Sequence, residues 1–178
     1  MRDALPQAID PRRLAELGGE LAGDLPLARM PRLAAVVERA DGEDTGSAAF
    51  TLRFRRDAAG RILVEGTVAA TLRLRCERCM GLLDLPVQSS FVLAVVAGLD
   101  EAARLPEDYE PLLPEDTTVD PAALVEDELL LAVPAVPRHA AGACRPPAFV
   151  AAAGDAREDQ PSDKENPFAV LEALKRRH

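Results

Sequence analysis

The sequence predicts an α+β fold: an antiparallel β meander curled into a sheet or small open barrel, with flanking short helices and a C-terminal docking helix. Two observations support this fold class. Three consecutive segments alternate apolar and polar residues with a period of two, which is typical of strands with one buried face. Short stretches that begin with Asp-Pro or Asn-Pro predict helices before and after those segments.

The longest alternating segment covers residues 61–79 and ends in a Cys-x-x-Cys turn. Its even positions, which include Ile62 and Leu72, are apolar, whereas several odd positions carry arginine. A strand of this length exceeds the usual five or six residues. We therefore expect it to bend near Gly66 and to pair with different neighbours along its length.

Two further alternating segments, residues 48–56 and 83–96, are expected to pair with it on either side. The second of them follows a four-residue turn, 77–80, which places Leu74 opposite Leu83. With this pairing the apolar residues of all three strands share one face. The sequence therefore predicts a meander with a buried inner face and a polar outer face.

Proline and glycine divide the rest of the chain. A helix is predicted over residues 11–17 with Leu14 and Leu17 facing inward, a first strand over 33–38, and another helix over 121–133. The predicted organisation has four parts: an N-terminal helix and extended segment (1–46), an antiparallel β core with an acidic loop and helix (47–139), a flexible linker (140–165) and a C-terminal helix (166–178).

The charge is unevenly distributed along the chain. The formal net charge is −9; residues 1–80 hold 13 basic and 12 acidic side chains, whereas residues 81–178 hold 8 and 18. A polyanion should therefore approach the first half, and a basic protein the second. The chain lacks a long apolar run, a signal-peptide pattern and enough cysteines for a disulfide framework, so we expect a cytoplasmic protein without a membrane partner.

Three cysteines and one histidine are candidate metal ligands. Cys76, Cys79, His139 and Cys144 could together hold Zn²⁺, because thiolates and imidazole are its usual ligands. Such a site would fasten the segment after the 121–133 helix to the central hairpin. The alternatives are that the cysteines are a vestigial or simple thiol pair, and that His139 merely ends a loop. A redox dithiol is disfavoured, because the Cys-x-x-Cys turn lies between strands and not at a helix N-terminus.

The predicted outer face of the meander is a candidate RNA-binding surface, because guanidinium groups in a row can follow phosphates. The alternative is an ordinary solvated strand face, in which Arg73 lies opposite Asp84. The candidate RNA-binding residues are Arg53, Arg55, Arg61, Arg73 and Arg75.

The acidic second half is a candidate protein-binding surface, although acidic runs are usually solvated faces and carboxylates are favoured in the first turns of a helix. A short C-terminal helix with a narrow apolar stripe would also need a docking partner, in cis or on another protein. The candidate protein-interaction residues are Glu126, Asp127, Glu128, Phe168, Leu171 and Leu174.

Enzymatic signatures are missing from the sequence. It has no phosphate-binding glycine loop, no His-Glu-x-x-His motif, and only His139 and the terminal His178 as imidazoles. The acidic residues show no evident converging geometry for a catalytic metal. We therefore expect a non-enzymatic protein, with a metal-dependent RNA-processing enzyme as the least favoured reading.

Four pieces of the chain together resemble the YceD family, which is linked to accumulation of large-subunit ribosomal RNA. They are CERC at 76–79, PEDYEPLL at 106–113, the run from DPAALVEDELLLAVPAVPRH at 120–139 to Cys144, and NPFAVLEALKRR at 166–177. The resemblance implies an accessory factor for synthesis, processing or stability of 23S ribosomal RNA. Its partner would be that RNA, directly or indirectly. The acidic second half suits a basic ribosomal protein, and the alternative function is a protein-interaction module or chaperone for such a protein without RNA contact. Many relatives carry two cysteine pairs, whereas this chain has His139 and Cys144 in place of the second.

Overall fold

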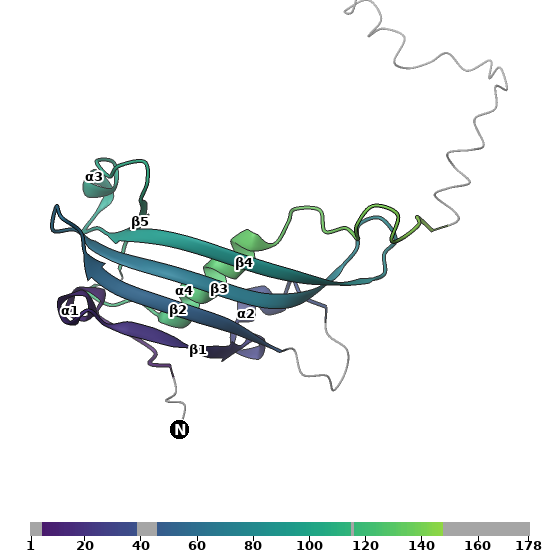
Figure 1. Ribbon diagram of the computed structural model, residues 1–178, viewed down its shortest axis with the longest axis horizontal. Coiled ribbons are helices and arrows are strands. Elements are labelled where there is room, and N and C mark those ends of the chain that lie inside the picture. The colour runs from purple at the N-terminus through teal and green to yellow at the C-terminus, as the bar shows by residue number, and fades with distance from the viewer. Residues whose placement is uncertain (1–4, 39–45, 115, 148–178) are drawn as a thin grey trace, which may run out of the picture.

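The computed structural model describes residues 5–38, 46–114 and 116–147. Within these ranges the chain forms one open, mostly antiparallel sheet in the order β1-β2-β3-β4-β5, which confirms the predicted fold class (Figure 1). The strands are β1 (Glu20–Pro26), β2 (Ser47–Arg56), β3 (Ile62–Arg75), β4 (Leu82–Val95) and β5 (Glu110–Leu112), of which only β5 runs parallel to its neighbour. The helices are α1 (Pro11–Leu17), η1 (Leu27–Arg29), α2 (Pro31–Ala34), α3 (Leu99–Ala102) and α4 (Pro121–Ala132).

The registers of the central strands follow the apolar alternation. Leu72 lies opposite Leu85 and Leu74 opposite Leu83, as predicted. In the other hairpin Phe54 lies opposite Val64. All three pairs keep apolar side chains on the same face of the sheet, so the predicted meander is confirmed.

The hydrophobic core lies between this inner face and the helices. Leu72 and Val64 of β3 are fully buried, and so are Val125 and Leu129 of α4. Helix α4 crosses one side of the sheet, and α1 and α2 add Ala15 and Leu33 to the same core (Figure 1). The opposite face, which carries most of the arginines of β2 and β3, is largely left to solvent.

Helix α1 occupies the residues predicted for it. The Asp10 side chain accepts hydrogen bonds from the backbone N–H groups of Arg12 and Arg13, and Gly18 ends the helix at a φ of 60°. The prediction that Leu17 faces inward is wrong, because its side chain is 73% exposed. The small residue Ala15 occupies the buried face of this short helix.

The prediction of a strand over residues 33–38 is also wrong. The chain forms the short helix α2 at Pro31–Ala34, and the first strand is β1, which pairs with β2. Pro31 occupies the first helical position, where its missing N–H is not needed. A carboxylate from α4 then accepts hydrogen bonds from the next two backbone N–H groups. A tertiary contact therefore stabilises helix in an apolar stretch that is ambiguous by itself.

Gly66 allows β3 and β4 to pack closely at the centre of the sheet. It lies directly opposite Phe91, whose ring covers it. A Cβ atom on residue 66 would lie 1.9 Å from the Phe91 Cζ atom, so no side chain fits there while the ring keeps its position. The aromatic ring thus fills the space that the glycine leaves in the inner face.

Candidate metal centre

The turn between β3 and β4 places two cysteines at one end of the sheet. β3 ends at Arg75, and the backbone N–H of Cys76 donates to the Gly81 carbonyl at 2.8 Å. Met80 donates to the Cys76 carbonyl at 2.8 Å and has a φ of 62°, which closes the turn in the left-handed region. Both thiols of the Cys-x-x-Cys motif are thereby held close to the chain that returns into β4.

The segment after α4 carries the other two ligands to the same place. Pro134 follows the end of the helix, and the chain then runs along the cysteine turn. The Pro137 carbonyl accepts a hydrogen bond of 2.9 Å from the Glu77 backbone N–H, which ties this segment to the turn. His139 and Cys144 then point toward the two cysteines.

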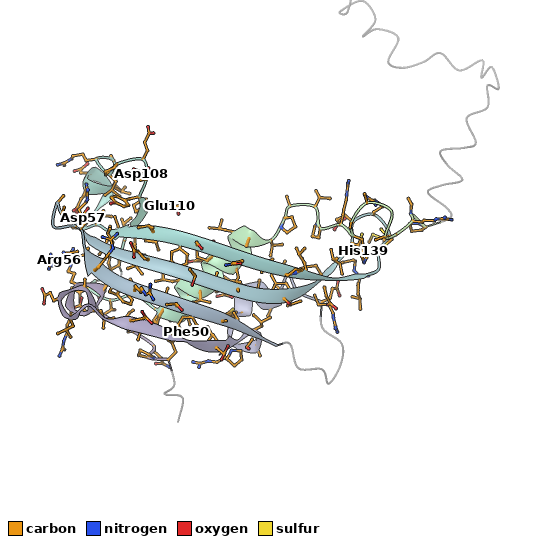
Figure 2. All side chains as sticks on the ribbon, in the orientation of Figure 1. Phe50, Arg56, Asp57, Asp108, Glu110 and His139 are labelled. Atoms are coloured by element: carbon orange, nitrogen blue, oxygen red, sulfur yellow. The ribbon has the colours of Figure 1, made fainter. Side chains whose placement is uncertain are left out.

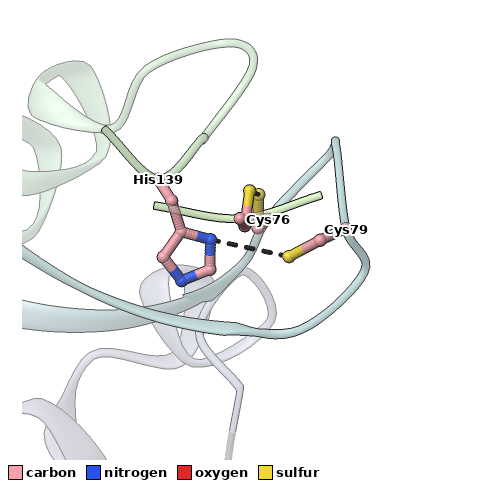
Figure 3. A group of neighbouring side chains, drawn as sticks. Cys76, Cys79 and His139 are labelled. Carbon is pink, nitrogen blue, oxygen red and sulfur yellow. Dashed lines mark hydrogen bonds between the residues drawn. The ribbon is translucent and has the colours of Figure 1, made fainter. Parts of the chain in front are cut away.

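The four side chains lie together, as predicted. Figure 3 shows Cys76, Cys79 and His139 of this group. Their ligand atoms all lie within 4.8 Å of one another. The Cys76 and Cys144 sulfurs are 3.9 Å apart, and the Cys79 sulfur is 3.5 Å from His139 Nδ1. A tetrahedral zinc ion with Zn–S bonds of about 2.3 Å and a Zn–N bond of about 2.0 Å requires S–S separations of about 3.8 Å and S–N separations of about 3.5 Å. The cluster therefore has the size of a closed zinc site.

The orientation of His139 suits a metal ligand. Its Nε2 lies 3.0 Å from the Leu82 carbonyl oxygen. Because a carbonyl oxygen can only accept a hydrogen bond, Nε2 carries the ring proton and donates a hydrogen bond to the Leu82 carbonyl. The lone pair of Nδ1 then points toward the sulfurs, an arrangement in which the outer hydrogen bond fixes the ring and the tautomer.

The pKa values of the Cys76 and Cys144 thiols shift in opposite directions. Burial raises the pKa of the Cys76 thiol, but hydrogen bonds from the backbone N–H groups of His139, Cys79 and Arg78 outweigh this effect and lower its pKa to about 5. The Cys144 thiol has a raised pKa, because burial and the neighbouring Cys79 and Cys76 sulfurs disfavour its thiolate. Thiolates that crowd together in this way are stabilised by a bound cation.

Comparisons with known proteins identify the family of the chain. Residues 64–175 match the model of the family described as large ribosomal RNA subunit accumulation protein YceD. The chain is also 33% identical, over 97% of its own length and 97% of the relative's length, to the large ribosomal RNA subunit accumulation protein YceD of Haemophilus influenzae. The chain belongs to the YceD family. No solved structure matches it.

In this YceD family member the arginines of the predicted RNA-binding row all have acidic partners. Arg53 pairs with Glu20 of β1 at 2.7 Å, and Arg73 pairs with Asp84 of β4 at 3.0 Å. The remaining pairs are Arg55–Glu65, Arg61–Asp57 at 2.7 Å and Arg75–Glu38 at 2.8 Å. Arg61 also lies over the Tyr109 ring, 5.1 Å from its centroid.

These ion pairs favour the alternative of an ordinary solvated strand face over a row of unpaired guanidinium groups. Three of the carboxylates come from the meander and its turn, and Glu20 and Glu38 come from the segment before it. The resulting outer face alternates in charge, and the argument that a row of unneutralised guanidinium groups follows phosphates no longer holds. RNA binding by these five arginines stays a prediction.

The acidic residues of α4 lie in three different environments. Glu126 is 5% exposed and accepts hydrogen bonds from the backbone N–H groups of Arg32 and Leu33 at 2.6 and 2.9 Å. Glu128 is 7% exposed, accepts from the Ser89 hydroxyl at 2.9 Å and has a pKa raised by burial. Of the three α4 residues proposed for protein interaction, only Asp127 is exposed. The other three proposed residues, Phe168, Leu171 and Leu174, lie outside the described residues.

Two contributors to these sites had no signal in the sequence. The Leu82 carbonyl orients His139, and a backbone acceptor cannot be recognised from residue type. Arg32 pairs with Glu126, which is 94 positions away in the chain. Within the described ranges no helix is long and apolar enough to cross a membrane.

Proposed function

We propose that this YceD family member is a non-enzymatic, cytoplasmic accessory factor for the synthesis, processing or stability of 23S ribosomal RNA during assembly of the large ribosomal subunit. The membership in the YceD family carries this proposal, because the family's description names accumulation of large-subunit ribosomal RNA. The relative from Haemophilus influenzae carries the same description and is similar along nearly the whole chain.

The arrangement of the titratable groups supports a non-enzymatic role. His139 is held by the Leu82 carbonyl and faces the cysteine sulfurs, so its imidazole is engaged on both sides. The two buried carboxylates, Glu126 and Glu128, bond to α2 and to Ser89. These groups stabilise the fold and do not converge on an open pocket in the part of the chain that the structure describes.

Sedimentation of cell extracts tests the proposal. In a strain depleted of the protein, we expect 23S ribosomal RNA to fall relative to 16S, and the tagged protein to sediment with precursor large subunits in a complemented strain. A normal ratio of the two RNAs after depletion would refute the proposal. Degradation of precursor RNA by the purified protein, lost on chelation of metal, would instead support the enzymatic reading.

A second candidate function is a chaperone for a basic ribosomal protein without RNA contact. The observation that favours it is the acidic end of the sheet, where residues 100–110 hold five carboxylates and one arginine. Figure 2 shows Asp108 and Glu110 at this end, far from His139. RNase treatment of the co-sedimenting complex separates the two modes of action, because a protein-only complex survives the digestion.

We also propose that Cys76, Cys79, His139 and Cys144 hold a structural Zn²⁺ ion. The support is the set of four nitrogen and sulfur ligands within 4.8 Å of one another, two of whose separations match a tetrahedral zinc site, together with the hydrogen bond between His139 Nε2 and the Leu82 carbonyl. Such an ion would join the segment after α4 to the β3–β4 turn. A simple thiol pair would not need the histidine in this position.

Metal analysis of protein purified without chelator tests the zinc proposal. We expect about one equivalent of zinc, and less than a tenth of an equivalent would refute it. His139→Asn and Cys79→Ser should lower the zinc content, whereas His178→Asn, which changes the only other histidine, should leave it unchanged. Equal zinc content in all the variants would show that these side chains are not the ligands.

A further inference from the structure

Three arginines lie beside the ligands of the candidate metal centre. Arg78 precedes Cys79, Arg138 precedes His139, and Arg145 follows Cys144. Consecutive Cα atoms are about 3.8 Å apart, so each arginine is anchored within one residue of a cluster whose ligand atoms lie within 4.8 Å of one another. The fold thereby gathers three guanidinium groups from two distant parts of the sequence at one end of the sheet. We call Arg78, Arg138 and Arg145 the basic rim.

The basic rim differs from the strand-face arginines in its charge balance. None of its three side chains forms an ion pair with any residue of the described ranges, whereas every arginine of the predicted row does. Arg138 and Arg145 are exposed, and Arg78 is half-buried. Glu77 is the one carboxylate within the turn and is exposed. Three guanidinium groups beside one carboxylate leave a net positive charge, which attracts anions.

Exposed apolar side chains lie next to these charges. Met80 and Leu82 are 49% and 54% exposed in the cysteine turn, and Val136 is 49% exposed in the segment before His139. Single-stranded RNA offers phosphates to guanidinium groups, and its unstacked bases stack on guanidinium planes. An acidic peptide would also pair with the charges and could pack on the apolar side chains. The description of the family, which names accumulation of large-subunit ribosomal RNA, favours RNA as the occupant.

The charge of the whole molecule orients this end toward a polyanion. The acidic residues of 100–110 lie at the far end of the sheet from the cysteine turn (Figures 1 and 2). A molecule with a group of carboxylates at one end and the basic rim at the other approaches RNA with the rim end first. The same arrangement leaves the acidic end directed away from the RNA.

We propose that the basic rim is the RNA-binding surface of this protein and that it contacts the phosphate backbone of single-stranded large-subunit ribosomal RNA. This inference rests on the proposed function and moves its RNA contact from the ion-paired strand face to the metal end. The candidate metal centre serves as the support that holds the three arginines together. The interaction is electrostatic and depends little on sequence.

Salt-dependent binding to a defined probe tests this proposal. The probes are a fluorescein-labelled single-stranded 20-mer of uridine and a 23S transcript, both titrated with the full-length protein between 50 and 200 mM salt. The triple variant Arg78→Gln, Arg138→Gln, Arg145→Gln should bind at least about tenfold more weakly at 100 mM salt. Each lost single-strand phosphate contact removes about 0.7 from the salt slope, so the slope should fall by about 2.

A matched control uses arginines at the opposite end of the sheet. Arg12, Arg13 and Arg104 are exposed and also have no ion pair with a described residue. Their triple change to glutamine removes the same charge and should alter the affinity less than twofold. Replacement of the three rim arginines by lysines should keep RNA binding, because the proposed interaction depends on charge. The zinc content and thermal unfolding of every variant compared must match those of the wild type.

Three results would overturn the inference. The first is unchanged RNA binding by the basic-rim variant, and the second is an equal loss of binding in the control variant. The third is a complex of the wild type with precursor subunits that survives RNase but is lost in the basic-rim variant. That third result would indicate an acidic protein as the partner. A failure here is distinguishable from failure of the proposed function. The rim is wrong if the wild type co-sediments with precursor subunits but the variant does so equally; the function is wrong if depletion leaves 23S ribosomal RNA unchanged.

Discussion

Replacing Glu126 by alanine is expected to destabilise the fold more than any change to a neighbouring acidic residue. One carboxylate oxygen, Oε1, accepts hydrogen bonds from the backbone N–H groups of both Arg32 and Leu33, and the other accepts from the Arg32 guanidinium at 3.1 Å. Leu33 is fully buried. The variant leaves the first donors of α2 without an acceptor in a place that water reaches poorly.

The magnitude follows from these contacts. A buried donor left without a partner costs about 1–3 kcal/mol, and a hydrogen bond to a charged group contributes about 1.5–3 kcal/mol. Arg32 is half exposed, so its own ion pair adds little. We therefore expect Glu126→Ala to lower the free energy of unfolding by about 3–5 kcal/mol. For a chain of this size that corresponds to a fall in Tm of roughly 6–20 °C.

Urea unfolding followed by far-UV circular dichroism measures this change in the free energy of unfolding. The comparison requires that the variant and the wild type have the same m-value, the slope of that free energy against urea concentration. Asp127→Ala is the matched control, because Asp127 also pairs with Arg32 but is exposed, and should cost less than about 1 kcal/mol. Glu126→Gln keeps an oxygen for both backbone donors and should lie between the two. Equal losses for Glu126→Ala and Asp127→Ala would refute the proposed role of the carboxylate in holding α2.

Three further predictions concern buried groups in the core and the cysteine cluster. Glu128 has a pKa raised by burial, so the folded state binds its proton more tightly than the unfolded state does and stability falls as the pH rises through that pKa. Glu128→Gln, which can keep the Ser89 contact, should therefore unfold at a higher temperature than the wild type at pH 7. The difference in Tm should shrink toward about pH 4, near the pKa of a glutamate in the unfolded chain. Equal Tm values at pH 7 would contradict this prediction. Gly66→Ala should cost about 1–3 kcal/mol by displacing the Phe91 ring, while Gly66→Ala combined with Phe91→Leu should recover part of the loss in a denaturant titration. Adding a chelator to metal-loaded protein should lower its Tm and expose Cys76 to a thiol reagent, whereas a Cys76 that reacts equally with and without chelator would argue against a bound ion.

Local sequence patterns indicated only part of the candidate metal centre. The spacing of the Cys-x-x-Cys turn indicated two of the four candidate ligands, because two thiols so close in sequence share one turn. His139 and Cys144 were candidates by residue type alone. His139 and Cys144 lie 60 and 68 positions from the cysteines that they approach. Their place depends on α4, which crosses the sheet and directs the following segment back toward the turn.

Charge pairing was the feature that the sequence predicted least well. The alternation of β2 and β3 correctly placed arginines on the outer face, but Glu20 and Glu38, which neutralise Arg53 and Arg75, come from segments outside the meander. A long charged side chain pairs with an opposite charge that the fold brings within about 4 Å. The arginines that have no ion pair with a described residue therefore had to be found from the structure around them, and those of the basic rim lie beside the candidate metal centre.

The amino-acid sequence by itself determined which residues face inward on the central strands, the register of the β3–β4 hairpin, and the ends of α1 and α4. These depend on periods of two and on capping residues that act over a few positions, so local order suffices. The tertiary structure decided that residues 31–34 form a helix, that Glu126 is buried, and which arginines have no carboxylate partner among residues 5–38, 46–114 and 116–147. Each of these is set by a contact between segments tens of residues apart, and only the packed chain brings such groups within hydrogen-bonding distance.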